Sequence, residues 1–341
     1  MKPTRLTRHP ATSPSSSLSQ RRRRVVGGLA ALLGLPLAAR AQSPGAPASG
    51  STITLLVPYA AGGAADVVGR VVTERASRLL GQPIVIENRP GAGGAIAAGA
   101  VARSAPDGLT LLLTSVAIPA VNPHLLSLNF DPLKDLATVA TVATGYTALV
   151  VPAKSPFKTL EELIESGRGQ PGKLSYGSSG QGSITHLTAE LFNIAAGIKA
   201  QHVPYKGNPQ VIQDLVGGSL DFAFDGAWKP NTAAGLVRAL AYTGTKRSPL
   251  LPAVPTVQEV LPGYVGFEPW IGFALSSRTP EPLLDRLGAA LLQAAAEPDV
   301  EARLSAAGFE RRPMNRREIE AVIRRDHRTL GDLIRSQGIK P

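Results

Sequence analysis

The chain has 341 residues, of which 43% are hydrophobic and 18% are charged, and it contains no cysteine. That length suggests two domains of roughly 150 residues each, and the missing cysteine excludes disulfides, thiol chemistry and cysteine-ligated metal sites. The net charge is +11, but residues 1–41 carry +8 of it and residues 42–341 only +3, so the sequence predicts no nucleic-acid partner.

Residues 1–41 have the pattern of an export signal. A basic stretch ends in Arg21 to Arg24, an apolar run "VVGGLAALLGLPLAA" follows, and Ala39-Arg40-Ala41 forms a small-x-small cleavage site. The apolar run is short and broken by glycines and Pro36, which argues against a permanent membrane span. The sequence therefore predicts a signal peptide of the twin-arginine or Sec type and a periplasmic protein. Residues 42–50 would be a flexible mature N-terminus, and a disordered basic tail is the alternative for the first segment.

Short apolar runs alternate with helical patterns from residue 53 onward. Strands are predicted at 53–57, 83–88 and 109–115, with a helix over 66–81 and a helix of small residues that runs to Ala105. This alternation predicts a parallel sheet that is covered by helices on both faces.

The alternation of predicted strands and helices begins again in the second half of the chain. The sequence predicts strands at 148–153, 173–178, 200–205, 220–225 and 238–244, and helices at 160–167, 183–197 and 208–218. A last apolar run at 270–277 precedes three helices, at 281–296, 298–307 and 316–337, that have no obvious sheet of their own.

We therefore expect the C-terminal part to return to the first unit. The predicted fold class is α/β, with two lobes joined by two crossovers around a central cleft. The first domain would contain residues 51–147 and 272–341, and the second would contain residues 148–271. Hinge motion would occur at the crossovers near 145–152 and 266–277.

Four predicted strand-to-helix loops share one composition. Residues 58–66, 114–122, 176–186 and 204–209 are rich in Gly, Ser, Thr and Ala and poor in charge. In parallel α/β sheets, ligands bind beyond the carboxyl ends of the strands, where helix N-termini present free N–H groups to anions. Glycines 62, 63, 180 and 182 would let a small carboxylate approach that backbone.

Each of these signals also has a purely structural interpretation. The glycines could serve only the turns, and Asp66 could cap its helix. His186 could be a hydrogen-bonded structural histidine, Lys206 a solvated surface cation and Asp225 a turn residue. Four similar loops that face one cleft are less expected by chance than any single loop.

Signatures of enzymes are missing from the sequence. "GAGGAIAAG" at 91–99 lacks the third glycine of a dinucleotide fingerprint and the acidic residue about 20 positions later. There is no Walker A motif, no Gly-x-Ser-x-Gly elbow, and no metal-ligand spacing among the five histidines. We therefore predict a protein that is not an enzyme and that has no catalytic residue, metal or cofactor.

Several longer stretches together resemble one known family. They are "VPYAAGGAADVVGR", "IVIENRPGAGGAIAAGAVARSAPDGLTLLL", "FDPLKDLATVATVA", "GKLSYGSSGQGSITHLTAELF", "HVPYKGNPQVIQDLVGGSLDFAFD", "RALAYTGTKRSPLLPAVPTVQE" and "TPEPLLDRL". In this order, over roughly residues 52–340, they resemble the Bug/TctC extracytoplasmic solute receptors of tripartite tricarboxylate transporters.

The resemblance implies a monomeric periplasmic binding protein of the type II-like two-lobed fold. It would enclose a small carboxylate (a di- or tricarboxylate, an acidic amino acid or an aromatic acid) and serve a membrane permease or a sensor; an enzyme on the same scaffold is the alternative. The implied ligand-binding residues are Tyr59, Gly62, Gly63, Asp66, Ser115, Ser178, Gly180, Ser183, His186, Tyr205, Lys206 and Asp225. The pair Ala64-Ala65 departs from the family, which often has a hydroxyl residue there.

The export signal gives a first testable prediction. We expect cleavage after Ala41, so that the exported protein begins at Gln42. Mass spectrometry of the periplasmic protein measures this directly, and a mature mass that still includes Arg21 to Arg24 would contradict it.

Overall fold

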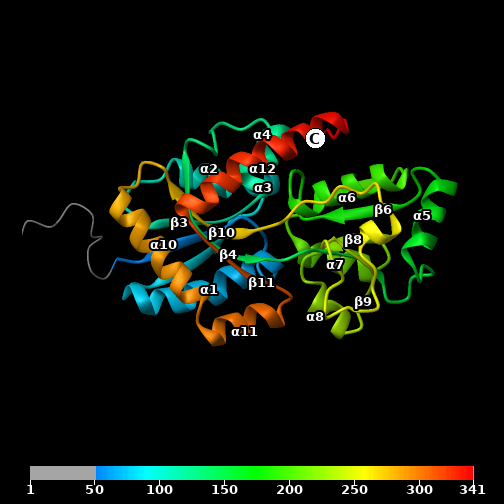
Figure 1. Cartoon of the computed structure of the whole chain (residues 1–341), viewed down its shortest axis with the longest axis horizontal. Helices are drawn as coiled ribbons and strands as arrows, with labels where there is room; N and C mark the ends of the chain where they lie inside the picture. Colours follow the sequence, from blue (N-terminus) through cyan, green and yellow to red (C-terminus); the bar gives the residue numbers. More distant parts are fainter. Residues whose placement is uncertain (1–50, 341) are drawn as a thin grey trace, which may run out of the picture. The chain divides into compact units, whose positions relative to one another are not determined.

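The computed structural model describes residues 51–340, so the predicted signal peptide, its cleavage site and the predicted flexible segment 42–50 lie outside the described residues. Two separate sheets organise this part of the chain (Figure 1). We call each sheet with the helices packed on it a lobe. Both lobes belong to one compact unit.

Lobe 1 is built on a six-stranded mixed sheet. Its order is β11-β4-β10-β3-β1-β2. The strands are β1 (Ile53–Val57), β2 (Ile84–Asn88), β3 (Thr110–Ser115), β4 (Leu136–Thr144), β10 (Ile271–Ser276) and β11 (Glu310–Asn315). Strands β1, β2 and β3 are parallel as predicted, whereas β10 runs antiparallel to β3 and β4, and β11 runs antiparallel to β4.

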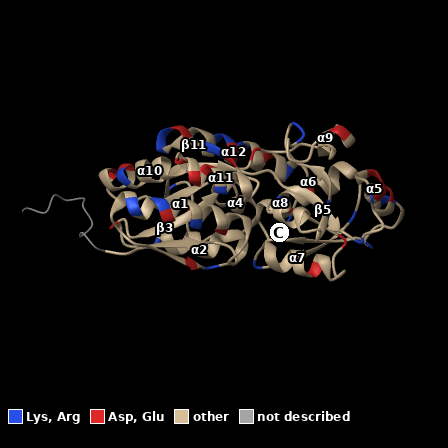
Figure 2. Ribbon diagram, turned by 90° about the horizontal axis from the view of Figure 1, so that it is seen from below, with Lys and Arg blue, Asp and Glu red and all other residues tan. Residues whose placement is uncertain are grey.

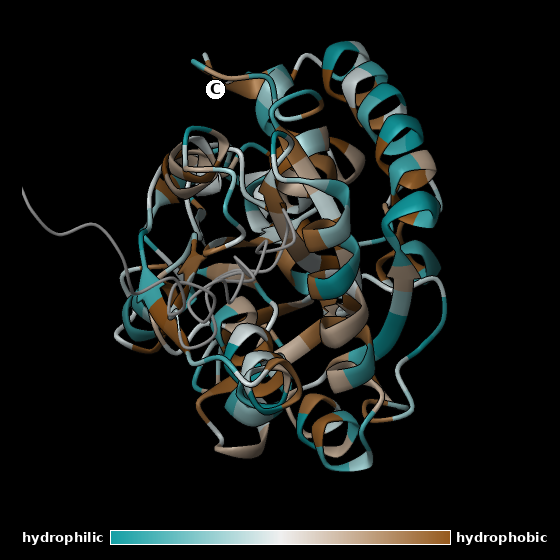
Figure 3. Cartoon of the chain, turned by 90° about the vertical axis from the view of Figure 1, so that its left-hand side faces the viewer, coloured by the Kyte–Doolittle hydropathy of each residue, from teal (hydrophilic) through white to brown (hydrophobic). Residues whose placement is uncertain are grey.

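Helices cover both faces of this sheet. Alternation along β1 directs Leu55 toward α1 and α10 and the next residue, Leu56, toward α2. One group of helices comprises α1 (Ala64–Leu80), α10 (Glu281–Ala295) and α11 (Pro298–Ala306), and the other comprises η1 (Ala92–Gly94), α2 (Ala95–Ala102), α3 (Ala117–Ala120), α4 (Asn122–Leu125) and α12 (Arg316–Ser336). Figure 3 shows brown, hydrophobic strands enclosed by helices that carry teal on their outer sides.

Lobe 2 is built on a five-stranded sheet of order β7-β6-β8-β5-β9. The strands are β5 (Ala148–Pro152), β6 (Ser175–Ser178), β7 (Gln201–Pro204), β8 (Phe222–Asp225) and β9 (Val237–Tyr242). Here β6 is parallel to β7 and β8, and β5 is antiparallel to β8 and β9. The helices are α5 (Leu160–Gly169), α6 (Ile184–Ala196), α7 (Asn208–Val216), α8 (Trp228–Ala233) and α9 (Val257–Val260).

Buried side chains divide between the two faces of the second sheet. Phe222 and Phe224 of β8 pack with Phe192 of α6, while Ala223 lies on the face covered by α7 and α8. Helix α6 ends at Gly197, whose φ of 65° is the left-handed conformation that favours glycine. The stop that the sequence predicts at this residue is therefore confirmed.

The C-terminal part returns to lobe 1, as predicted. Its three helices begin at the predicted residues 281, 298 and 316. The sequence patterns omitted β4, β11 and the short helices α3, α4, α8 and α9, and they did not indicate that antiparallel strands join the parallel ones in each sheet. Strand β11 carries the exposed residues Glu310 and Arg311 at the edge of its sheet, so it lacks a hydrophobic alternation.

Two connections join the sheets, between β4 and β5 and between β9 and β10. The first connection, residues 145–147, lies within the predicted crossover near 145–152, whereas the second, residues 243–270, overlaps only the start of the one predicted near 266–277. The domain boundaries at 147/148 and 271/272 and the hinge motion stay predictions.

The loops of the two lobes contact each other through main-chain atoms. The Ala60 N–H donates to the Lys206 carbonyl at 3.2 Å. A Cβ on Gly207 would lie 2.7 Å from the Ala60 Cβ and 2.9 Å from its nitrogen, and a Cβ on Gly93 would overlap the Gln181 carbonyl oxygen. The contact between the lobes therefore requires residues without side chains at these points.

This contact leads to a prediction about lobe closure. Gly207→Ala should wedge the lobes apart, because Gly207 has an extended backbone (φ 172°) that alanine adopts without strain, so only the collision with Ala60 remains. Small-angle scattering should show a larger radius of gyration than in the wild type. Gly263→Ala is the matched control, since nothing lies within 4 Å of its Cβ position; equal radii for both variants would contradict the prediction.

Candidate functional site

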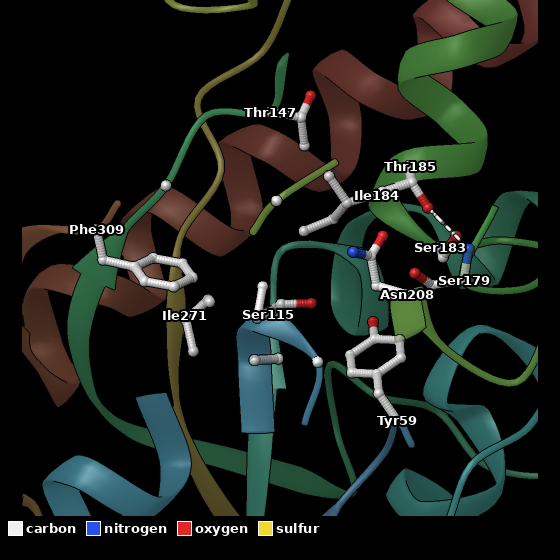
Figure 4. Close-up of a pocket in the computed structure, with 15 residues that line it drawn as sticks. Tyr59, Ser115, Thr147, Ser179, Ser183, Ile184, Thr185, Asn208, Ile271 and Phe309 are labelled. Atoms are coloured by element: carbon white, nitrogen blue, oxygen red, sulfur yellow. Dashed lines mark hydrogen bonds between the residues drawn. The ribbon is translucent and has the colours of Figure 1, made fainter. Parts of the chain in front are cut away.

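A cavity of about 90 Å³ is lined by residues from both lobes (Figure 4). Lobe 1 and the first connection contribute Tyr59, Gly63, Ala64, Ala65, Ser115, Gly145, Ile271 and Phe309. The other lining residues are Thr147, Ser179, Ser183, Ile184, Thr185, Asn208 and Gly226. We call this cavity the cleft pocket.

Three helices begin at the cleft pocket. The first residues of α1, α6 and α7, which are Ala64, Ile184 and Asn208, all line it. The first turn of a helix has N–H groups without intrahelical partners, and these groups carry the positive end of the helix dipole. In α1 the first intrahelical bond runs from the Val67 N–H to the Gly63 carbonyl, so the N–H groups of Ala64 and Ala65, which line the pocket, have no intrahelical partner. The arrangement suits an anion.

Hydroxyl groups surround the same end of the pocket. Tyr59, Ser115 and Ser179 line it from two lobes, and the labelled side chains of Figure 4 lie around one space. Ser115 is only 4% exposed. Its Oγ makes no hydrogen bond of normal geometry, although it lies near the Tyr59 hydroxyl. A buried hydroxyl without a partner is costly, so Ser115 is free to bond a ligand.

Burial dominates the electrostatics of this hydroxyl pair. It raises the pKa of Tyr59, an effect that the neighbouring Ser115 hydroxyl partly offsets. Tyr59 is therefore a neutral hydrogen-bond donor at physiological pH.

The opposite end of the cleft pocket is apolar. Phe309 and Ile271 are buried there, whereas Ile184 of α6 lies across the pocket from them, beside Thr185 and Ser183 (Figure 4). Gly145, in the connection between β4 and β5, leaves room for the Phe309 ring, because a Cβ at this position would overlap it.

No Asp, Glu, His, Lys or Arg is among the residues that line the cleft pocket. The Asp66 carboxylate lies just behind it and accepts hydrogen bonds from Arg70 at 2.7 Å, Asn88 at 2.8 Å and the Gly62 N–H at 2.9 Å. Burial alone would raise the pKa of Asp66, but these bonds outweigh it and lower the pKa below its usual value. Asp66 thus ties α1 to the preceding loop, which is the structural role that the sequence left open.

Asp225 is also fully engaged inside lobe 2. Its carboxylate accepts hydrogen bonds from Asn208 at 2.6 Å, the Ala227 N–H at 2.7 Å and Asn231 at 2.7 Å. Burial raises the pKa of Asp225, which these three bonds only partly counteract. Through Asn208 the carboxylate fixes the start of α7 at the pocket.

Two stacked histidines hold the loop before α6. The rings of His186 and His202 are 4.2 Å apart between centroids. His186 Nδ1 accepts the Gly182 N–H at 3.2 Å, so this nitrogen carries no proton. His202 Nε2 lies 2.6 Å from Ser178 Oγ, and the Gly180 N–H donates to the same oxygen at 3.2 Å. Ser178 and His186 therefore shape the loop from behind the pocket.

Four of the twelve predicted binding residues line the cleft pocket, namely Tyr59, Gly63, Ser115 and Ser183. Gly180, Tyr205 and Lys206 line a separate depression next to Gly91 and Gln181. Gly62, Asp66, Ser178, His186 and Asp225 line neither of these two pockets. For all twelve, the role in ligand binding stays a prediction.

Sequence patterns did not point to several lining residues. Asn208 and Ser179 stand in loops that were singled out for their glycines, and their polar side chains were a usable signal. Gly145 and Phe309 are far apart in the chain and in unremarkable sequence, and only the pairing of β11 with β4 brings them together.

Within residues 51–340 no group of three or more potential ligands is placed to hold a metal ion. None of the helices in this range combines the length and apolar character that a membrane crossing needs.

Positive and negative side chains are mixed on the surface. Figure 2 shows blue and red residues on helices such as α10 and α12, and Arg316 of α12 pairs with Glu281 of α10.

Two lobes with an uncharged, anion-suited pocket between them define the class of solute-binding proteins. The family model for the tripartite tricarboxylate transporter family receptor (TctC) matches residues 68–339, and the chain belongs to this family. The predicted Bug/TctC resemblance and the two-lobed periplasmic-binding-protein fold are thereby confirmed.

Relatives and solved structures agree with this assignment. A "UPF0065 protein in gbd 5'region" of Cupriavidus necator is 40% identical over 263 residues, which cover 76% of this chain and 79% of that protein. MatC of Rhodopseudomonas palustris, solved with bound malate, is 32% identical with a TM-score of 0.79, covering 83% and 98% of the two chains. Another R. palustris protein, solved with adipate, is 31% identical with a TM-score of 0.81, covering 85% and 98%.

The histidine pair predicts how stability depends on pH. Burial lowers the pKa of His186 and of His202 to about 4, from an ordinary 6.5. The unfolded chain therefore binds protons near pH 6.5 and the folded protein only near pH 4, so stability is full above pH 6.5 and falls as the pH drops toward 4. Urea denaturation should show a lower midpoint at pH 5 than at pH 7.

Replacing one histidine of the pair tests whether the pair causes this pH dependence of stability. His202→Gln should reduce the difference between the two midpoints, because one of the two depressed groups is gone. An unchanged pH dependence in this variant would contradict the assignment to the pair.

Proposed function

We propose that the protein is a periplasmic receptor that captures a small organic carboxylate between its lobes. The observation that carries this proposal is the convergence of three helix N-termini on a pocket that contains the buried, unpartnered Ser115 hydroxyl. A helix N-terminus stabilises an anion by about 0.3–1 kcal/mol, and by up to ~2 kcal/mol when it is partly buried. Charge-assisted hydrogen bonds add ~1.5–3 kcal/mol each.

Membership of the receptor family supports this function. The two R. palustris relatives were solved with malate and adipate, which are both carboxylates. In this chain the carboxylate head would be bound by N–H groups and hydroxyls without an ion pair. Of the predicted contacts, Tyr59, Gly63, Ser115 and Ser183 would touch it, and Gly62, Asp66, Ser178, Gly180, His186, Tyr205, Lys206 and Asp225 would support the loops around it.

The partner would be a membrane permease of the tripartite tricarboxylate type or a sensor, served by a monomeric receptor. The family description names such a transporter, and the predicted signal peptide would deliver the protein to the periplasm. Closure by the predicted hinges would enclose the ligand, since a ligand that contacts both lobes favours the closed state.

An enzyme on the same scaffold is the competing function. Catalysis would need a nucleophile, an acid–base group or a metal at the ligand. The lining of the cleft pocket offers serines and threonines but no histidine or carboxylate that could activate them. This composition favours binding over chemistry.

Ser115→Ala tests the proposed function with two readouts of opposite sign. The variant should be as stable as the wild type or more stable without ligand, because it removes a buried hydroxyl without a partner. Its affinity for a carboxylate should fall about tenfold, which corresponds to ~1.4 kcal/mol. Thermal denaturation and calorimetric titration measure the two effects.

Ser155→Ala provides the matched control. The Ser155 hydroxyl is buried outside the pocket and accepts the Phe157 N–H, so this variant should lose stability and keep its affinity. If Ser115→Ala instead loses stability and binds as the wild type does, Ser115 does not contact the ligand and the proposed site is wrong.

A further inference from the structure

We infer that Asn208 determines ligand specificity, and that it selects an acid with a hydroxyl group on the carbon next to the carboxylate. This inference rests on the proposed function and narrows its ligand class. It follows from the hydrogen bonds of the Asn208 side chain, which engage its amide nitrogen and leave its carbonyl oxygen at the cleft pocket.

The orientation of the Asn208 amide is fixed by Asp225. The Ala227 main-chain N–H donates to Asp225 Oδ1 at 2.7 Å, so this carboxylate oxygen is an acceptor. The Asn208 atom that lies 2.6 Å from the same oxygen must therefore be the amide nitrogen Nδ2, which is a donor. Asn231 donates to the other carboxylate oxygen at 2.7 Å and keeps the carboxylate in place. The carbonyl oxygen of Asn208 consequently faces away from Asp225.

This carbonyl oxygen, Oδ1, accepts no hydrogen bond from any residue in the range 51–340. Asn208 is only 8% exposed and lines the cleft pocket, and its Oδ1 retains solvent contact. Figure 4 draws its side chain among those that surround the pocket. The serine and threonine hydroxyls of the lining can donate or accept, whereas Oδ1 can only accept. A ligand that fills the pocket must therefore supply a donor to this atom.

A ligand without such a donor would bind at a cost. A carboxylate oxygen or a hydrocarbon group placed against Oδ1 would displace its water and leave a buried acceptor unpaired. The cost does not depend on whether the rest of the ligand is small, charged or aromatic. The Asn208 carbonyl therefore discriminates on one group of the ligand only.

A hydroxyl group suits this position better than an ammonium group. Asn208 is the first residue of α7, so its own N–H has no intrahelical partner. A hydroxyl can accept from a free N–H while it donates to Oδ1, whereas an ammonium can only donate, and its charge is disfavoured at the positive end of a helix dipole. Since the carboxylate would bind at the same helix N-termini, the hydroxyl belongs on the adjacent carbon.

Three pairs of acids that differ only in this hydroxyl group test the inference by calorimetric titration of the exported protein. They are propanoate and lactate, succinate and malate, and phenylacetate and mandelate, with both enantiomers of each hydroxy acid. In every pair of which a member binds, we expect the better enantiomer of the hydroxy acid to bind about tenfold more tightly than its parent acid. The matching amino acids, which are alanine, aspartate and phenylglycine, should bind more weakly than the hydroxy acids.

Asn208→Ala should remove the preference, so that the ratio of the two affinities within a pair approaches one. Asn231→Ala is the matched control, because it also deletes one hydrogen bond to Asp225 but does not line the cleft pocket. It should keep the wild-type ratio. A general loss of affinity cancels in this ratio, and the wild-type comparison stands without either variant.

The outcomes distinguish this inference from the proposed function. Equal affinities within the pairs would overturn the inference while the carboxylate receptor stands, and amino acids that bind as tightly as the hydroxy acids would overturn the choice of a hydroxyl. A preference that survives in Asn208→Ala, or that Asn231→Ala also removes, would overturn the role of Asn208. If none of these acids binds, the proposed carboxylate receptor itself is contradicted, and the inference with it.

Discussion

The structure depends on one constraint: the N–H groups at the start of a helix need partners, and α1, α6 and α7 bring theirs to one shared space. The parallel strand pairs β1–β3 and β6–β7 fix this arrangement, because they place successive strand-to-helix loops at one edge of each sheet. Side chains behind the pocket complete it. Asp66 and Asp225 bond the segments from which α1 and α7 start, and the pair of His186 and His202 holds the loop before α6.

The close approach of the two lobes also depends on main-chain atoms in the loops. If main-chain N–H groups of both lobes bind the ligand, the main chain must approach it from both sides. The side chains in these loops must therefore be small. Gly93 and Gly207 stand where the opposite lobe comes closest. Under the proposed function, the close approach of the lobes and the binding of an anion would both depend on the glycines in these loops.

The sequence predicted the elements with strong periodicity. The start of α10, α11 and α12, the stop of α6 at Gly197 and the return of the chain to lobe 1 all follow from local patterns, and the same patterns predicted two α/β lobes independently of the family resemblance. It did not predict β4 and β11, because β4 is rich in small residues and β11 is a charged edge strand whose pairing is decided by tertiary contacts. For the site, glycine and hydroxyl signals located the anion-suited end. The apolar end depends on Phe309 and Gly145, which no local pattern connects.

Recognition through main-chain atoms has an evolutionary consequence. Every residue except proline has a backbone N–H group, so few point mutations can remove it, and under the proposed function the affinity for the carboxylate head group would be little affected by most substitutions. Differences in ligand specificity would then come from side chains that line the pocket, such as Phe309 and Ile271. Under the same proposal, duplicated genes for this scaffold would diverge in ligand preference through single changes at those side chains, while every copy keeps the same main-chain site for the head group.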